Sequence, residues 1–203
     1  MRSNHKARYL LAAALLATAA TSLALALART GPPTSAHAAA TTRRAAKLPP
    51  VGTSSTALAA RFAIVSGRHS NECALRPQSV DSLAVDGRLQ GSCCTPMVFE
   101  HYAQQVRSLA GYRAVVQVPR DPYDIPVGQA KQLLTYDRQI TLTAAQQAVY
   151  QKAMRLADEH GPCCCHCWRW SAFEGQARYL ISRRSYHARQ IASVWDLEDG
   201  CGG

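Results

Sequence analysis

The sequence predicts a mostly α-helical domain, a small bundle of about five helices with cysteine-bearing loops at the helix ends. Three observations lead to this prediction. Apolar residues recur at spacings of three and four in several segments after Gly91. Helix-start and helix-stop residues flank those segments. Half of the 8 cysteines fall in the run 163–167, directly after the helix-stopping pair Gly161-Pro162.

Residues 1–38 are predicted to be a signal peptide or an N-terminal membrane anchor. Residues 1–8 carry basic side chains and no acid, and residues 9–28 form an uncharged run rich in Ala and Leu. That run is long enough to span a bilayer as a helix, and Ala36-His37-Ala38 has the small-x-small form of a cleavage site. Both alternatives stay open. In either case we expect an extracytoplasmic protein, secreted or held at the membrane by residues 9–28.

Residues 39–60 are predicted to be a flexible linker, because Thr, Ala, Pro and Ser dominate and apolar periodicity is weak. Residues 61–203 are predicted to form the helical cysteine-rich domain. Without the leader, 19 basic residues face 13 acidic ones, and the surplus is spread along the chain. Outside the cell such a surplus suits an anionic surface, so we expect no nucleic-acid partner.

The first elements of the domain have ambiguous patterns. Residues 61–65 fit either a short strand or a helical turn, and residues 80–89 are compatible with a short helix without requiring one. The first clear helix is expected to start at Thr95-Pro96, because Thr is a good N-cap and Pro suits the first helical position. Gly111 would end it. This places Cys93 and Cys94 immediately before a helix N-terminus, where the dipole lowers a thiol pKa.

The second half of the chain predicts four more helices. Thr143 and Gln146 form a capping box at the start of one of them. The expected ranges are 127–136, 143–159, about 170–181, and 187–195. The remaining segment, 196–203, is acidic and Gly-rich and is expected to be a flexible tail.

The cysteine run predicts a site for a soft metal ion. If the run is extended, the side chains of Cys163, Cys165 and Cys167 point the same way, which makes them the primary thiolate candidates. A tetrahedral site would need further thiols, and we expect them from a second loop, Gly91–Met97, packed against the loop Gly161–Trp168. Thiolates favour Cu(I), Zn(II) or iron–sulfur clusters, and of these we expect Cu(I) or Zn(II). The remaining candidate ligands are Cys93, Cys94, Cys164 and His166.

Residues Pro162-Cys163-Cys164-Cys165-His166-Cys167 resemble the Pro-Cys-X-Cys-X-Cys pattern of bacterial exported proteins named for a PCYCGC motif. As in that family, the motif follows a helical segment. Cys164 replaces the Tyr of the family and His166 the Gly, and the lipidated cysteine is missing. The resemblance implies an exported, metal-binding protein, and it supplies no catalytic residues.

Two alternatives compete with metal binding. The cysteines inside the run could form disulfides with those outside it, Cys73, Cys93, Cys94 and Cys201, giving a stapled structural or interaction domain. Alternatively, Cys164 and Cys167 form a Cys-X-X-Cys pair suited to a thiol–disulfide oxidoreductase. No other catalytic pattern stands out. We therefore expect capture and delivery of a metal ion rather than catalytic turnover, with the protein partner unidentified.

Overall fold

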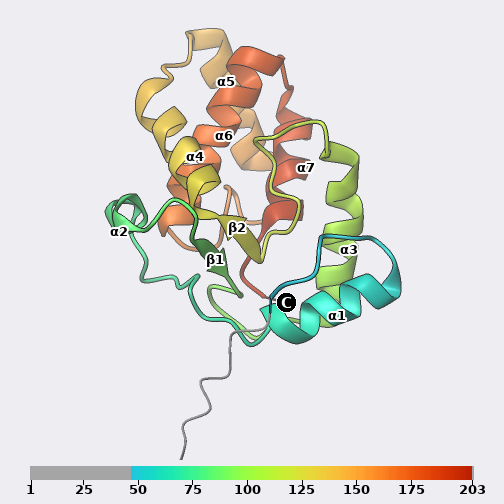
Figure 1. Ribbon diagram of the computed structural model, residues 1–203. Coiled ribbons are helices and arrows are strands. Elements are labelled where there is room, and N and C mark those ends of the chain that lie inside the picture. The colour runs from blue at the N-terminus through green and yellow to red at the C-terminus, as the bar shows by residue number, and fades with distance from the viewer. Residues whose placement is uncertain (1–46, 203) are drawn as a thin grey trace, which may run out of the picture. The chain divides into compact units, whose positions relative to one another are not determined.

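The computed structural model describes residues 47–202, which form seven α-helices and one two-stranded sheet (Figure 1). The mostly helical class is therefore confirmed. The helices outnumber the expected five because two early segments, α1 and α2, are also helical. The elements are α1 (Ser55–Val65), α2 (Pro77–Ser82), β1 (Arg88–Gln90), α3 (Phe99–Leu109), a 3-10 turn (Ala110–Tyr112), β2 (Asp124–Pro126), α4 (Val127–Gln139), α5 (Ala144–Leu156), α6 (Trp168–Arg184) and α7 (Ala188–Glu198).

The four C-terminal helices form the main bundle, in which α4 packs along α6 and α5 along α7 (Figure 1). Its core includes the fully buried side chains of Leu133, Trp168, Phe173, Leu180 and Trp195. Helix α5 starts with the predicted capping box, since the Thr143 hydroxyl accepts a hydrogen bond from Gln146 N and the Gln146 side chain accepts one from Thr143 N. This bundle is the rigid base from which the cysteine run projects.

A smaller core joins α1 and α3 to the chain before β2. Leu58, Val65, Tyr102, Val106 and Tyr123 are buried there. The short strands β1 and β2 pair antiparallel, with Leu89 opposite Ile125. Together these elements hold the Gly91–Met97 loop against the end of the main bundle.

The helix expected from Thr95 begins at Phe99 instead, with Val98 as its N-cap. The prediction was wrong because Thr95 has another partner: its amide and its hydroxyl both donate to Cys201 O, at 2.8 and 2.7 Å. Cys93 and Cys94 are therefore several residues away from the helix N-terminus. The residue at an N-terminus is Cys167, the N-cap of α6.

Two segments expected to be flexible are partly ordered. Helix α1 begins at Ser55, capped by the Ser54 hydroxyl, so the last part of the 39–60 segment is helical. Helix α7 continues to Glu198, and Gly200 O accepts a hydrogen bond from Cys93 N at 2.9 Å. The flexible-tail prediction is therefore wrong for residues 196–202, and Gly203 lies outside the described residues. The predicted leader, residues 1–38, lies outside the described residues.

Among residues 47–202, every helix is too short or too polar to cross a bilayer.

Candidate metal centre

Four separate chain segments carry the cysteines, and backbone hydrogen bonds bring these segments together. Asn71 is the central link, because its buried side chain donates to Gly91 O and accepts from Trp168 Nε1, both at 2.9 Å. The Trp168 amide in turn donates to Leu75 O at 3.0 Å. One asparagine thus connects the segments that contain Cys73, Cys93-Cys94 and the run 163–167.

The fourth segment, Gly200–Gly202, lies alongside the Cys93-Cys94 loop. Gly202 allows this arrangement, since its φ of 120° lies in the left-handed region and a side chain there would collide with Thr95 O. Tyr123 holds both segments, because its backbone oxygen accepts a hydrogen bond from Gly91 N and its hydroxyl donates one to Gly202 O at 2.8 Å. Cys201 is placed next to Cys93 and Cys94 as a result.

The eight cysteines form one connected group of sulfur atoms. Cys94 is the hub: its Sγ lies 2.7 Å from Cys73, 3.5 Å from Cys93 and 3.4 Å from Cys164. Cys73 also lies 3.0 Å from Cys165. Cys201 lies 3.8 Å from both Cys93 and Cys163, and it forms a disulfide with Cys164. Cys167 joins the group through a hydrogen bond with Cys163.

Several of these separations suit a thiolate-bound metal ion. With Zn–S bonds of about 2.3 Å, two ligands of a tetrahedral ion lie about 3.8 Å apart. The sulfurs of Cys73, Cys93, Cys94 and Cys165 all lie within 4.8 Å of one another, so this set of four thiols can hold a metal ion. Cys73 is closer to its neighbours than an ion requires and would have to move outward by about 1 Å.

The structure brings together six of the seven predicted ligands and separates the seventh. The loops Gly91–Met97 and Gly161–Trp168 meet as expected, at Cys94 and Cys164. His166 instead stacks on Trp170, with ring centroids 3.9 Å apart. Within residues 47–202, no group of potential ligand atoms includes His166, and none includes Cys167, which joins the cluster only through its contact with Cys163.

Sequence reasoning left Cys73 and Cys201 out of the ligand set. Each is alone in its segment, and nothing in the local sequence separates such a cysteine from a surface thiol. The even total of cysteines was the available signal, because it favours every cysteine having a partner in the fold. The pairing Cys164–Cys201 replaces the Cys164–Cys167 pair that the oxidoreductase alternative required.

A buried cation lies beneath the sulfurs. Arg169 is 0% exposed and donates to Pro122 O and Glu198 O, while Phe173 covers its guanidinium with the ring centroid at 4.9 Å. Among the described residues, no carboxylate forms an ion pair with it. Burial lowers the pKa of this guanidinium, but the negative charge of the sulfurs beside it, that of Cys163 first, outweighs this effect and raises the pKa. The Cys163 thiolate therefore provides the counter-charge that a buried arginine needs.

The inner sulfurs share one negative charge. Hydrogen bonds from Cys167 and Cys93 lower the pKa of Cys163 to about 2, even though burial opposes this. The hydrogen bond to Cys163 raises the pKa of each of those two donors. Burial, followed by the contact with Cys73, raises the pKa of Cys165 to about 11. Cys163 is thus the thiolate of the metal-free cluster, which suits it to be a metal ligand.

Glu198, next to Arg169 in the core, gives a testable pH dependence. Burial raises the pKa of this carboxyl well above its usual value. Its Oε1 accepts from Gln176, whereas Glu198 Oε2 and Gln176 Oε1 have no hydrogen-bond partner among residues 47–202. A neutral carboxyl avoids the cost of burying a charge that has too few hydrogen-bond partners.

We therefore expect Glu198→Gln to stabilise the protein increasingly as the pH rises above about 4.3. Below that pH the carboxyl is neutral in both the folded and the unfolded state. Above it the unfolded chain ionises while the folded chain stays protonated, so the wild type loses stability with rising pH. Urea unfolding at several pH values measures this, with the exposed-site variant Glu159→Gln as control. A difference between Glu198→Gln and wild type that does not change with pH would contradict the assignment.

Comparisons with family models, curated protein sequences and solved structures found no significant match.

Proposed function

We propose that this protein is an exported soft-metal binding protein that captures or delivers Cu(I), Zn(II) or a similar ion through its cysteine cluster. The observation that carries the proposal is the convergence of all eight cysteines, from four chain segments, on one connected group of sulfurs. A fold that needed only disulfides would bring its cysteines together in isolated pairs. Here Cys94 alone has four other sulfurs within 3.9 Å.

Charge and burial support the same proposal. A divalent ion with four thiolate ligands carries a net negative charge, and the buried guanidinium of Arg169 offsets part of it. Exposure falls from Cys94, which is exposed, through Cys73 and Cys165 to the buried Cys163 and Cys167. An ion can therefore exchange at the outer thiols without the core being opened. Export rests on the predicted leader and on the resemblance to the PCYCGC-motif proteins.

A ligand substitution tests the proposal. We expect Cys165→Ser to weaken binding of Zn(II) or Cu(I) by more than about 100-fold, because changes in residues that only orient a ligand already cost about 10–100-fold. Binding is measured anaerobically by competition with a chromophoric chelator, together with a free-thiol count on the same sample. The matched control is His166→Ala, the neighbouring residue on the same run, which we expect to leave affinity unchanged.

The disulfide Cys164–Cys201 favours a second candidate, a disulfide-stapled structural or interaction domain. The same measurement separates the two. If the purified protein takes up no metal and its intact mass shows all eight cysteines oxidised, the stapled domain is correct and the metal-binding proposal fails.

A further inference from the structure

The disulfide between Cys164 and Cys201 lies among free thiols that are close enough to attack it. The sulfur of Cys94 is 3.4 Å from Cys164 and 3.9 Å from Cys201. Thiol–disulfide exchange needs a thiolate in contact with a disulfide sulfur, and reacting atoms are well placed at about 3–3.5 Å. Cys94 meets this distance at Cys164, and its similar separation from Cys201 shows that it lies beside the disulfide bond. A rotation of the exposed Cys94 side chain must therefore bring its sulfur into line with the bond before it attacks.

A second thiol, that of Cys73, contacts Cys94. Cys73 Sγ is 2.7 Å from Cys94 Sγ, closer than any other pair of free cysteine sulfurs for which the described chain gives a distance. Cys73 and Cys94 are therefore placed to form a disulfide of their own. There is thus a continuous row of sulfur atoms, in the order Cys201, Cys164, Cys94 and Cys73.

We propose that the disulfide moves along this row, from Cys164–Cys201 to Cys73–Cys94, by two exchange steps inside the cluster. In the first step the Cys94 thiolate attacks Cys164, the Cys94–Cys164 bond forms, and Cys201 leaves as a thiolate. In the second step the Cys73 thiolate attacks Cys94, the Cys73–Cys94 bond forms, and Cys164 leaves as a thiolate. One disulfide is present before and after, so no external oxidant or reductant is consumed.

The position of the disulfide decides which thiols remain for a metal ion, and this consequence rests on the proposed function. With Cys164–Cys201 bonded, the four-thiol set Cys73, Cys93, Cys94 and Cys165 is complete. With Cys73–Cys94 bonded, that set loses two ligands. Cys201 and Cys164 then become available, but only in groups of three: Cys93, Cys163 and Cys201, or Cys163, Cys164 and Cys165. Movement of the disulfide would therefore release an ion held by the four-thiol set, and a bound ion would in turn block the movement by occupying Cys94.

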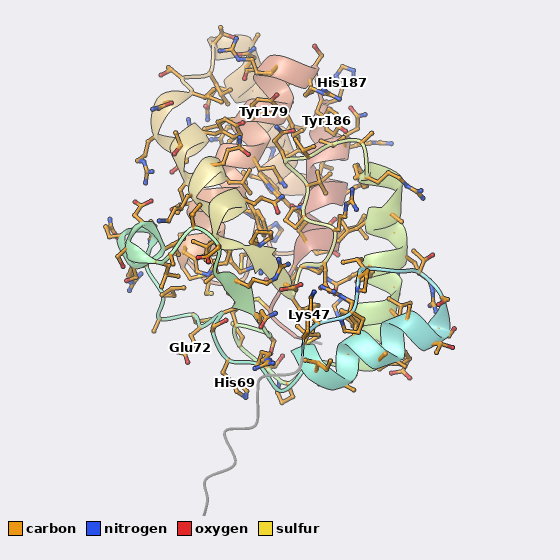
Figure 2. All side chains as sticks on the ribbon, viewed as in Figure 1. Lys47, His69, Glu72, Tyr179, Tyr186 and His187 are labelled. Atoms are coloured by element: carbon orange, nitrogen blue, oxygen red, sulfur yellow. A yellow bond between two sulfur atoms is a disulfide. The ribbon has the colours of Figure 1, made fainter. Side chains whose placement is uncertain are left out.

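Cys94 is also open to solvent, which makes the exchange observable. It borders a cavity of about 390 Å³ that is lined by His69 and Glu72 among others. Figure 2 shows these two residues on the chain between α1 and α2. A small alkylating reagent can reach Cys94 through this cavity and trap the thiols that are free at any moment.

The test maps disulfides in the full metal-free chain that carries one disulfide. After equilibration the sample is quenched in acid and alkylated with N-ethylmaleimide, and the linked peptides are assigned by tandem mass spectrometry. We expect both Cys164–Cys201 and Cys73–Cys94 in the wild type. Cys94→Ser should abolish every Cys73-linked species, and Cys73→Ser should stop at Cys94–Cys164. The control Cys167→Ser, at a buried thiol outside the row, should keep both disulfides.

A wild-type sample that contains Cys164–Cys201 alone would overturn the inference. So would Cys73-linked peptides in the Cys94→Ser variant, because Cys94 would then not be the exchanging thiol. A parallel sample saturated with Zn(II) should contain only Cys164–Cys201. If neither Zn(II) nor Cu(I) binds, the proposed function fails together with the release step, whereas the metal-free map still decides whether the disulfide moves.

Discussion

Replacing Arg169 with methionine is expected to lower the free energy of unfolding by about 3–5 kcal/mol. The guanidinium is fully buried, and its hydrogen bonds to Pro122 O and Glu198 O tie the start of α6 to the chain before β2 and to the end of α7. Methionine leaves both carbonyl oxygens buried without a donor and removes the positive charge that faces Cys163 and Cys93. Urea unfolding at constant redox state measures the loss.

The matched control is Arg183→Met, at an exposed position in the last turn of the same helix, which should change stability by less than about 0.5 kcal/mol. Arg169→Lys keeps the charge but lacks the planar fork, so its stability should fall between wild type and Arg169→Met. If Arg169→Met does not fold, the lysine variant still permits a test. We expect Arg169→Lys to lower the free energy of unfolding but to leave the affinity for Zn(II) near the wild-type value, because the positive charge, and not the two hydrogen bonds, acts on the thiolates. A lysine variant as stable as wild type would show that the two hydrogen bonds contribute little.

Replacing Arg61 with methionine is expected to cost a similar amount, about 3–5 kcal/mol. Arg61 is 3% exposed and bonds Asp121, at 2.8 Å, and Asp124. Both carboxylates are buried, and without the guanidinium Asp121 keeps only hydrogen bonds from Tyr102 and from Tyr123 N. Asp121 would be left as a buried charge without a cation. Because Tyr123 also holds Gly91 and Gly202, the same substitution should weaken metal binding at the cluster.

An exposed ion pair supplies the comparison for Arg61. Arg138 and Asp81 lie 2.9 Å apart with side chains 50% and 39% exposed, and Arg138→Met should cost no more than about 1 kcal/mol. Denaturant titration of both variants gives the contrast. Equal losses at the two sites would mean that the Arg61 network is hydrated rather than buried, and would remove the expected effect on the cluster.

Local signals in the sequence predicted the helical elements well. The capping box at Thr143 and the apolar spacing after Trp170 depend on neighbouring residues, and both match the structure. The predicted stop at Gly161-Pro162 is too late, because α5 already ends at Leu156. The start at Thr95 failed because a residue more than 100 positions away, Cys201, takes its amide and hydroxyl. A capping preference cannot anticipate such a partner.

The candidate site could be predicted only in part, for the same reason. The dense run 163–167 and the pair Cys93-Cys94 indicate thiol chemistry without further evidence. The predicted helix ends indicated that the two loops carrying them would meet. Cys73 and Cys201 are positioned by the long-range hydrogen bonds of Asn71 and Tyr123, and local sequence composition does not predict such bonds. His166 was assigned as a ligand from its place in the run, but its ring packs on Trp170.

The wide spacing of the cysteines along the chain also has a consequence for the order of folding. Cys93 and Cys201 are separated by 108 positions, and closing a loop of that length costs about 4 kcal/mol of chain entropy beyond a constant. Contacts within the α4–α7 bundle span shorter loops and can form early. The sulfurs are therefore gathered last, so a nascent chain passes through a stage in which the run 163–167 is already dense in thiols while its distant partners are still absent. During that stage mispaired cysteines are the main hazard, and the rate of correct assembly should depend on the thiol reagents that surround the chain.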